Sequence, residues 1–524
     1  MGDSPLAAPR YPFERRPVLI ATLIFAILSI LTGFASDAFL EADACLHYLY
    51  SRFAFAEPHR FVDVWGRPIC TALYALPAAV AGRTGTRLTS LLLALAVATL
   101  AMAIARRQGY RWPALAFVFT LAQPMVFTHS FSELTELPFA LLVGGAFLAY
   151  QARRFATMAL VVSLMPLSRP EGFGFLLMAF VALVLHRRWA AILLLPFGLM
   201  LWNHVGWELF GRQEAWWRWL PNHWPYAAAS TYEPGHPLHF IASLPAVVSP
   251  AIFPATVFGI GICAWPWFAA LRRVPPAACP PVSLAVNGEG TGSKLPVAHD
   301  DVHRQRCDLL IAAIPLSILI VHGFLYWRGL MASNGELRYL LTMAPLWGVL
   351  SARGWAWGCE RLHVRSTYRW AAAACAVPVL LNQFYYTVLP LKLDDNWRTA
   401  QAVALDVRRQ WQAGSDRNVM AAHPGVFYFL DLSPIDPRAR DLNVGTIASP
   451  PPRTWLIFDS LYATRNADRG RVTTEADILA AGWVPDVELQ AVIDRVGATA
   501  ASPTTQPLSG VRTGLATWRA YVSP

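Results

Sequence analysis

Charged residues are scarce in this chain: they account for 15% of its 524 residues, whereas hydrophobic residues account for 55%. A soluble protein of this length would carry about a quarter of its residues as Asp, Glu, Lys or Arg. The deficit argues against an ordinary soluble enzyme, because the apolar residues collect in long runs that suit a bilayer. It indicates an integral membrane protein.

Lysine is almost absent, with Lys294 and Lys392 as its two occurrences, so arginine supplies nearly all of the net charge of +10. A strongly basic chain can indicate a nucleic-acid-binding protein. Here, however, the arginines lie in short clusters between the apolar runs, which is how basic residues orient membrane proteins. We therefore expect membrane lipids, and no nucleic acid, as partners.

Paired cysteine motifs are also lacking. The seven cysteines form no Cys-x-x-Cys pair, so the sequence gives no support to a zinc site or a redox motif. Cys45 and Cys70 are expected on the same side of the membrane. Whether they pair stays open, because spacing alone does not show that two side chains meet.

Long apolar runs, in contrast, are abundant. A bilayer core of about 30 Å needs about 20 helical residues. The sequence predicts an all-α polytopic membrane protein with about eleven transmembrane helices, at 17–36, 88–105, 113–128, 137–150, 156–168, 172–186, 189–205, 241–271, 308–327, 338–352 and 370–390. The run 69–82 is expected to be a re-entrant or interfacial helix.

The arginine clusters predict the orientation of these helices. If the N-terminus is cytoplasmic, every connection on the cytoplasmic side is basic, as the positive-inside rule requires. The arginine-rich and alanine-rich composition is typical of a bacterium with a GC-rich genome. We therefore expect a multi-pass protein of the bacterial inner (plasma) membrane.

The character of the chain changes after residue 390. Residues 391–524 lose the long apolar runs and gain an ordinary density of charge. The segment "WRTAQAVALDVRRQWQ" has helical spacing, and "VMAAHPGVFYFLD" and "TWLIFDS" are strand-like. We predict a membrane domain over 1–390 and a soluble α/β domain over 391–524, which an odd number of spans places outside the cytoplasm.

Two carboxyl groups follow the first apolar run, in the segment "EADACLHYLY". If this segment is helical, Asp43, His47 and Tyr50 share one face and Glu41 points elsewhere; if it is extended, Glu41 and Asp43 share a side. A carboxylate in a partly apolar cleft is suited to act as a general base. The alternative is that both acidic residues are interfacial and simply end a span.

A second acidic segment, "THSFSELTELPF", is expected outside between the third and fourth spans. Glu133 and Glu136 are candidates for binding a metal ion or an acceptor hydroxyl. The alternative for Glu133 is a capping box with Ser130, because the two residues have its spacing.

Two arginines are expected at the same membrane surface. Arg169 and Glu171 occur in "LSRPEGFGF", and Arg338 occurs in "NGELRYLLTMAPLW". The planar guanidinium group suits phosphate oxygens. The alternatives are a capping box from Ser168 to Glu171 and a flanking interfacial role for Arg338.

Tryptophans are concentrated between the seventh and eighth spans. Tryptophan prefers the headgroup layer, so the segment is expected to be an amphipathic helix on the membrane surface. A functional alternative is an aromatic face, such as that of Trp217, that stacks on a sugar ring or contacts a lipid chain.

The order of these segments resembles that of the polytopic glycosyltransferases of the C-fold class (GT-C). The similar members are bacterial protein mannosyltransferase-like, aminoarabinose transferase-like and arabinofuranosyltransferase-like enzymes. "EADACLHYLY" and "SELTE" resemble their two acidic loops, "SRPEG" their Arg-Pro-Glu-Gly turn, and "ELRYLLTMAP" their Arg-Tyr-Leu-Leu-Pro-like stretch. Many relatives carry Asp-Asp or Asp-x-Asp in the first loop, whereas this chain has Glu-x-Asp.

The resemblance implies a hexosyl- or pentosyltransferase that uses a polyprenyl-phosphate sugar donor and an acceptor hydroxyl of a lipid, polysaccharide or protein. Asp43 would then be the catalytic base, with Glu41 beside it. The other polar and aromatic candidates would bind substrate: His47, Glu133, Glu136, Arg169, Glu171, Trp217 and Arg338. A divalent metal ion (Mg or Mn), with Asp43 and Glu136 as ligands, is left open.

Two other functions are compatible with the sequence. A transporter or flippase of lipid-linked substrates would explain the spans, but it would place ionisable residues within them and break helices at mid-membrane. A non-catalytic membrane scaffold that displays the soluble domain would explain the topology. It would not require acidic loops together with arginines at one surface.

Overall fold

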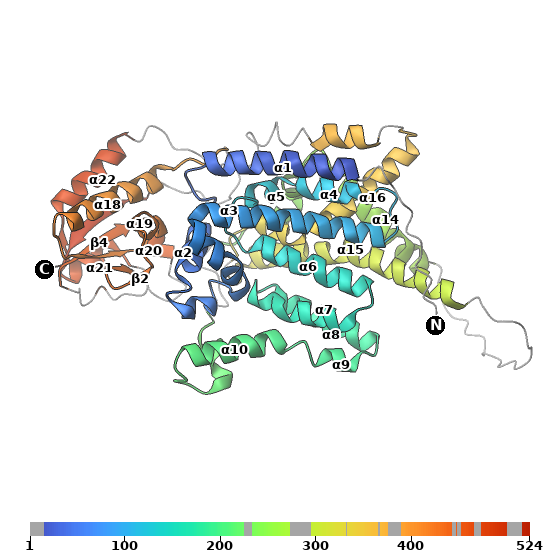
Figure 1. Ribbon diagram of the computed structural model, residues 1–524, viewed down its shortest axis with the longest axis horizontal. Coiled ribbons are helices and arrows are strands. Elements are labelled where there is room, and N and C mark those ends of the chain that lie inside the picture. The colour runs from blue at the N-terminus through green and yellow to red at the C-terminus, as the bar shows by residue number, and fades with distance from the viewer. Residues whose placement is uncertain are drawn as a thin grey trace, which may run out of the picture.

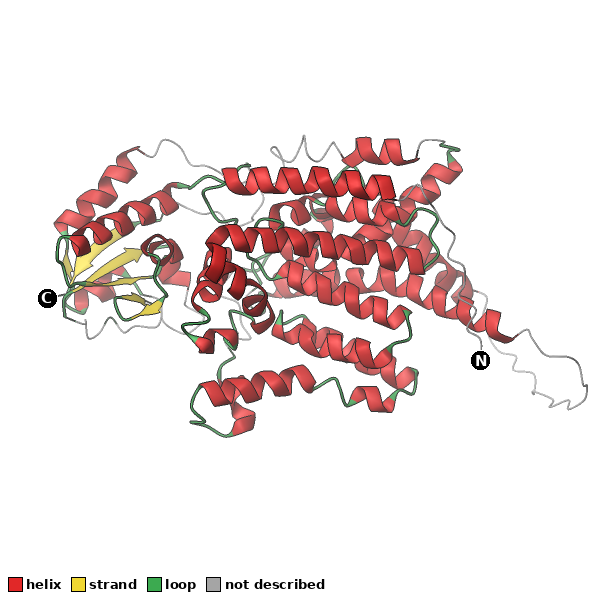
Figure 2. Cartoon of the chain, viewed as in Figure 1, coloured by secondary structure: helices red, strands yellow, loops and turns green. Residues whose placement is uncertain are grey.

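The computed structural model describes residues 15–224, 233–272, 295–331, 333–364, 367–375, 389–442, 447, 452–465, 473–499 and 516–523. Within these ranges the chain forms a bundle of helices with an α/β domain at one end (Figure 1). Figure 2 shows that the strands are confined to that domain. The division into a helical part and a smaller α/β part agrees with the predicted fold class.

The helical bundle contains both long helices and short helical turns. Its elements are α1 (Arg15–Ala35), α2 (Ala42–Phe53), η2 (Pro58–Phe61), α3 (Pro68–Arg107), α4 (Ala114–Leu121), α5 (Pro124–His129), α6 (Glu136–Gln151), α7 (Phe155–Leu164), η3 (Met165–Leu167), α8 (Gly172–Leu185), α9 (Trp189–Ile192), α10 (Phe197–Leu209), η4 (Trp216–Arg218), α11 (Trp219–Asn222), α12 (His239–Ala242), α13 (Leu244–Val248), α14 (Phe253–Arg272), α15 (Leu295–Arg328), η5 (Leu337–Met343) and α16 (Ala344–Arg361).

Four helical segments are long and apolar enough to cross a membrane: Arg15–Ala35, Pro68–Arg107, Trp189–Leu209 and Asp301–Arg328. Shorter apolar helices accompany them at Glu136–Gln151, Phe155–Leu167, Gly172–Leu185 and Phe253–Trp267. On α1, Leu23 and Leu31 are more than half exposed, as expected of side chains that face lipid. The architecture is that of a polytopic membrane protein, and the expected number of eleven spans is not confirmed.

The structure corrects two of the expected helices and agrees with a third. The run 69–82 is a helix of its own within α3, because the backbone at Gly82, with φ +56° and ψ −141°, is not helical and separates it from the rest of α3. Its re-entrant or interfacial character stays a prediction. The run 113–128 is divided at Gln123, whose extended backbone is what a following Pro124 favours.

The second corrected helix is the run 241–271, which is divided among α12, α13 and α14. Pro245 and Pro254 lie at the starts of the second and third of these helices. The expected span 370–390 lies mostly outside the described residues, which are helical at 367–375.

The α/β domain contains a six-stranded sheet with the strand order β2-β3-β1-β4-β6-β5. The central strands β1 (Asn418–Ala421), β3 (Ala439–Asp441) and β4 (Thr454–Asp459) are parallel, with β1 between the other two. The outer pairs are antiparallel and involve β2 (Ile435–Asp436), β5 (Val484–Pro485) and β6 (Trp518–Val522).

Helices cover both faces of this sheet. Trp455 and Ile457 of β4 pack with α18 (Asp395–Gln412), α19 (Pro424–Leu430) and α22 (Val487–Thr499). Leu456 and Phe458, the alternate residues of the same strand, pack with α20 (Tyr462–Arg465) and α21 (Glu475–Ala480). The central strands are therefore buried on both sides, as is usual for parallel strands.

The α/β domain packs directly on α2, which lies between that domain and the bundle (Figure 1). The rings of Phe39 and Tyr428 meet edge to face at 4.9 Å, and Tyr48 of α2 contacts Tyr428 at 5.8 Å. Beside them Ser433 donates a hydrogen bond of 2.8 Å to Glu57. One face of α2 is thus fixed by the α/β domain.

Cys45 and Cys70 do not form a disulfide. Both are free and buried. Cys45 Sγ lies 3.8 Å from the carbonyl oxygen of Pro424, and Cys70 Sγ lies 3.7 Å from Ser168 Oγ. The two thiols therefore contribute to separate packing contacts.

Candidate active site

Arg338 contacts four carboxyl groups. Its Nη1 lies 3.0 Å from Glu41 Oε2, and its Nη2 lies 2.6 Å from Asp43 Oδ2. Its Nε lies 3.7 Å from Glu136 Oε1 and donates a hydrogen bond to Glu336. The arginine side chain is 8% exposed, so these carboxyl groups replace the water that it loses.

Each of these carboxyl groups lies at the N-terminal end of a helix. Glu41 directly precedes α2, and Asp43 lies in its first turn. Glu136 is the first residue of α6, and Glu336 directly precedes η5. Acidic side chains are favoured at these positions by the helix dipole, which explains why separate elements present carboxyl groups to one arginine.

Exposure distinguishes the members of this group. The Asp43 side chain is 41% exposed, whereas the side chain of Glu136 is completely buried. Asp43 is therefore the carboxylate that a substrate can reach most directly.

Glu136 joins Arg338 to a second arginine. Arg169 Nη1 donates hydrogen bonds to Glu136 and, at 2.8 Å, to Thr135 Oγ1. Its Nη2 donates a hydrogen bond of 2.9 Å to Glu171 Oε1. Two arginines and five carboxyl groups thus form one continuous network.

The carboxyl groups of the network differ in how firmly they hold their protons. Burial raises the pKa of Glu41 well above its usual value, although Arg338 opposes this effect. Burial likewise raises the pKa of Glu336. Burial alone would raise the pKa of Glu171, but Arg169 and His322 hold it well below its usual range. Glu171 is therefore ionised at neutral pH, whereas Glu41 and Glu336 keep their protons to a higher pH.

His47 lies one helical turn after Asp43 and is buried. Its ring stacks on Trp65, with centroids 4.7 Å apart and an angle of 11° between the planes. Burial lowers the pKa of His47 to about 4, so the ring is neutral at pH 7. Within the described residues its Nδ1 makes no hydrogen bond. Of the two arrangements that the sequence left open, the helical one is observed for Asp43 and His47, although α2 is separate from α1. Glu41 does not point elsewhere, because it precedes α2 and contacts Arg338 as Asp43 does.

Glu133 lies outside the network. It is buried and accepts a hydrogen bond of 2.6 Å from Thr86 Oγ1 of α3. Burial raises the pKa of Glu133, with Arg83 and Arg87 opposing. The capping box with Ser130 is wrong, because α6 begins only at Glu136.

The second capping box is also wrong, because α8 begins at Gly172 and Glu171 pairs instead with Arg169. Trp217, the aromatic candidate, is 68% exposed on η4 and packs beside α10 rather than within the network. Its exposure agrees with the expected interfacial position, although the described part of this segment forms the short helices η4 and α11 rather than one amphipathic helix.

Glu336 was not predicted as a member of the site, and neither were His322, Tyr339 and Asn334. His322 Nε2 lies 3.3 Å from Glu171 Oε1, and the His322 ring stacks on Tyr339 at 4.9 Å. Tyr339 donates a hydrogen bond of 2.6 Å to Asn334 Oδ1. A signal for His322 was present in the sequence, because it is a histidine inside the apolar run 308–327.

The network does not fit the divalent metal ion that the sequence left open. Among the described residues, no group of three or more His, Cys, Asp or Glu side chains is placed to hold a metal ion. Asp43 and Glu136, the expected ligands, both contact Arg338. The guanidinium group already supplies the positive charge between them.

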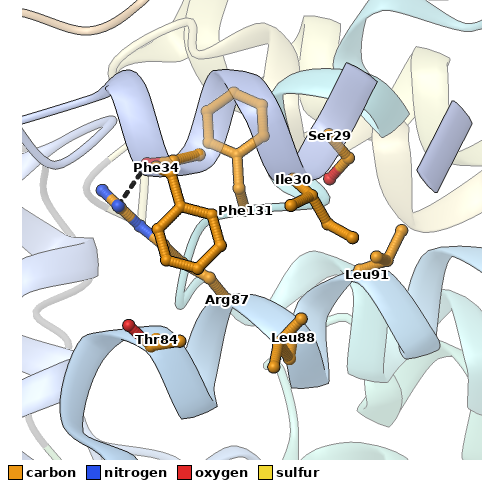
Figure 3. Close-up of a pocket in the computed structure, with 9 residues that line it drawn as sticks. Ser29, Ile30, Phe34, Thr84, Arg87, Leu88, Leu91 and Phe131 are labelled. Atoms are coloured by element: carbon orange, nitrogen blue, oxygen red, sulfur yellow. Dashed lines mark hydrogen bonds between the residues drawn. The ribbon is translucent and has the colours of Figure 1, made fainter. Parts of the chain in front are cut away.

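A small, partly open apolar cavity lies between α1 and α3 (Figure 3). Ile30, Leu88 and Leu91 line it, with Arg87 at one end. Arg87 donates hydrogen bonds to the carbonyl oxygens of Gly33 and, at 2.9 Å, Ser36. Arg87 therefore satisfies carbonyl groups near the C-terminal end of α1, and the cavity is separate from the charged network.

Comparison with known proteins supports the fold. No family model and no curated protein sequence matches the chain. Two solved structures of ArnT from Cupriavidus metallidurans are similar, each at 12% sequence identity over 95% of this chain and 97% of that chain. The structure bound to undecaprenyl phosphate gives a TM-score of 0.50, and the apo structure gives 0.52. At this identity the likeness concerns the fold alone: the chain has an ArnT-like fold, in agreement with the resemblance to aminoarabinose transferase-like enzymes seen in its sequence.

Proposed function

We propose that this protein is a membrane glycosyltransferase that moves a sugar from a polyprenyl-phosphate-linked donor to an acceptor hydroxyl. The observation that carries the proposal is the 2.6 Å contact between Arg338 and Asp43 at one end of an apolar bundle. A group suited to phosphate and a partly exposed carboxylate suited to act as a base lie side by side. The ArnT-like fold supports the proposal, as does the undecaprenyl phosphate bound in one ArnT structure.

The chemistry is a single displacement at the anomeric carbon. Asp43 accepts the proton of the acceptor hydroxyl while the hydroxyl oxygen bonds to that carbon. The bond from the carbon to the phosphate oxygen breaks, and the lipid phosphate leaves with the electron pair. Arg338 and Arg169 stabilise the charge that develops on it. Because one displacement attacks one face of the sugar, the transfer inverts the anomeric configuration.

Arg338 also couples donor binding to the availability of the base. Without donor, Asp43 Oδ2 is held by Arg338. A phosphate that binds Arg338 competes with Asp43 for the guanidinium group. Asp43 Oδ2 is then free to accept the proton of the acceptor hydroxyl. The base therefore becomes available when a donor is in place.

Glu41 has a different role from Asp43. Because burial raises its pKa, Glu41 is less ionised than an ordinary carboxyl group and is the poorer base at neutral pH. In its protonated form it is a hydrogen-bond donor to the phosphate or the sugar. In the Glu-x-Asp pair, Glu41 is therefore the hydrogen-bond donor and Asp43 is the general base.

The experiment that tests the proposal uses the protein in lipid nanodiscs with a panel of polyprenyl-phosphate sugars and candidate acceptors. We expect Asp43→Asn to lower transfer at least about 1,000-fold, because a general base and its charge are lost. The matched control is Asp37→Asn, since the Asp37 side chain is 60% exposed and pairs with Lys392 outside the network.

Normal turnover by Asp43→Asn, with unfolding temperatures equal to wild type, would remove Asp43 from the mechanism. Loss of turnover in Glu41→Gln alone would transfer the role of base to Glu41. If no donor in the panel binds, the proposed activity fails.

One observation favours a transporter or flippase as a second candidate. His322 lies within the candidate span Asp301–Arg328, and intramembrane ionisable groups occur along transport pathways. Movement of a lipid-linked substrate across sealed vesicles, without transfer of its sugar, would support this candidate over the glycosyltransferase.

A further inference from the structure

Eight side chains, Arg169 and Arg338 among them, form a closed ring of contacts. Six of the eight contacts are ion pairs or hydrogen bonds. The other two are the approach of His322 to the Glu171 carboxylate and the stacking of the His322 and Tyr339 rings. In order, the ring runs Arg169, Glu171, His322, Tyr339, Asn334, Glu336, Arg338, Glu136 and back to Arg169.

Two members of this ring, His322 and Glu136 through its Oε2, have buried polar atoms that make no hydrogen bond among the described residues. His322 comes from α15, is 6% exposed, and within the described residues neither of its ring nitrogens makes a hydrogen bond. Its Nε2 is nevertheless only 3.3 Å from Glu171 Oε1. A small rotation of either side chain therefore converts this contact into a hydrogen bond.

The ring stack fixes the plane of His322. Tyr339 lies against the His322 ring, with 25° between the two planes, and the Arg169 guanidinium lies 5.4 Å from the Tyr339 ring. Tyr339 is thus packed between the histidine and the arginine. His322 is held beside Glu171 rather than free to turn away.

Arg169 is already neutralised before any phosphate arrives. It contacts the carboxylates of both Glu136 and Glu171. An arginine with two carboxylate partners offers no net positive charge to an anion, so phosphate binding requires that one carboxylate withdraw. Glu136 is completely buried and is also held by Arg338, whereas Glu171 faces His322 on its other side. Glu171 is therefore the carboxylate that withdraws.

We propose that His322 is a positioning residue that receives the Glu171 carboxylate when a lipid phosphate binds Arg169. The ring N–H of His322 then donates a hydrogen bond to Glu171, which offsets the ion pair that Glu171 loses. No bond is made or broken covalently in this exchange. The inference rests on the proposed function for the identity of the ligand, and it deepens that function by assigning how Arg169 becomes available.

The test measures the affinity for undecaprenyl phosphate in phosphatidylcholine nanodiscs, with the bound fraction determined by native mass spectrometry. His322→Phe keeps a ring against Tyr339 but has no N–H, and we expect it to raise Kd about tenfold, as loss of a hydrogen bond to a charged group would. His322→Gln restores an N–H donor and should stay within about threefold of wild type. Phe324→Leu, at a 51% exposed position of the same helix, is the matched control.

A double-mutant cycle identifies the path through Glu171. Glu171→Gln removes the charge that competes for Arg169, so it should bind undecaprenyl phosphate more tightly than wild type. In that background His322→Phe should have no further effect on Kd. Because Glu171→Gln and His322→Gln both keep polar side chains, they test the exchange even if the phenylalanine variant does not fold.

The outcomes separate this inference from the proposed function. If wild type binds the lipid and His322→Phe binds it equally well, the proposed movement of Glu171 to His322 is wrong, whereas the proposed glycosyltransferase activity is not contradicted. The same conclusion follows if His322→Phe is as harmful in the Glu171→Gln background as in wild type. If wild type does not bind undecaprenyl phosphate, both fail together. If kcat falls while Kd and KM stay constant, His322 acts in another step and the positioning role is overturned.

Discussion

At the scale of single residues, the defining feature is an arginine that is shared by four carboxyl groups. Arg338 is 8% exposed, and its partners lie at the N-terminal ends of helices. Removing one partner from a buried ion pair usually costs about 3–5 kcal/mol, whereas the pair itself adds little stability. The network is therefore better explained by binding and catalysis than by stability.

The raised pKa of Glu41 predicts a dependence of stability on pH. Because folding raises this pKa, the folded state binds the proton more tightly than the unfolded chain, and its stability falls as the pH rises from the unfolded value through the folded one. Glu41→Gln cannot ionise, so its unfolding temperature should fall less than that of wild type as the pH rises through this window.

The measurement is thermal unfolding in nanodiscs at a series of pH values, with Asp37→Asn as the control outside the network. Parallel curves for Glu41→Gln and wild type would show that Glu41 has an ordinary pKa. Glu336→Gln should behave like Glu41→Gln, since burial raises that pKa as well.

The sequence identified most members of the site but not their contacts. Glu41, Asp43, Glu136, Arg169, Glu171 and Arg338 were all candidates, because charged residues next to apolar runs are costly and therefore noticeable. The pairing of Asp43 with Arg338, 295 residues apart, depends on the packing of distant helices and has no local signal. Glu133 and Trp217 had the same kinds of local signal and lie outside the network.

At the scale of elements, α2 has two contact faces. Asp43 contacts the network and His47 lies one turn further along the helix, while Ala44, Cys45 and Tyr48 are buried in the cluster shared with the α/β domain. The position of the proposed base therefore depends on packing against a domain that contributes no residue to the charged network.

This arrangement predicts the effect of truncating Tyr428, which contacts Phe39 and Tyr48. We expect Tyr428→Ala to weaken docking of the α/β domain by about 2 kcal/mol, to increase hydrogen exchange in α2, and to lower kcat about tenfold. Leu405→Ala is the control, because Leu405 is 50% exposed on α18 of the same domain.

Donor affinity should not fall in Tyr428→Ala, because Arg169 and Arg338 do not belong to α2 and a loosened Asp43 competes less with the phosphate for Arg338. An equal loss of donor affinity and kcat, with no change of exchange in α2, would argue against the coupling.

The sequence predicted the bounds of individual helices best where the apolar run has no proline beyond its first turn. The runs 17–36, 137–150 and 172–186 agree closely with α1, α6 and α8. The run 241–271 was predicted as one span although prolines divide it. The separation of 69–82 from the next helix agrees with the structure, because Gly82 at positive φ interrupts the helical backbone of α3 there.

At the scale of the whole molecule, the charged network lies close to two different parts of the protein, the apolar bundle and the α/β domain. The apolar bundle lies on one side of α2 and the α/β domain lies on the other (Figure 1). The arginine pattern predicts that this domain is extracytoplasmic. A lipid donor and a water-soluble or lipid acceptor can thus approach from different directions.

This orientation is testable with a surface cysteine. Leu479 is 48% exposed on α21 of the α/β domain, so Leu479→Cys should react with a membrane-impermeant maleimide in spheroplasts that retain an intact inner membrane. The native thiols Cys45 and Cys70 are buried and should react little. Reaction only after the membrane is opened would place the domain in the cytoplasm and reverse the predicted topology.

The separation of Arg338 from its partners also has a consequence for biosynthesis. A ribosome makes Glu41, Asp43 and Glu136 long before it makes Arg338, and the α/β domain that holds α2 follows later still. During that interval the nascent protein carries acidic groups at its membrane surface without their counter-ion. A messenger RNA truncated before codon 338 should therefore yield a polypeptide that is inserted in the membrane but lacks the ion pairs of Arg338. Quality-control proteases should degrade this product faster than one that ends just after η5.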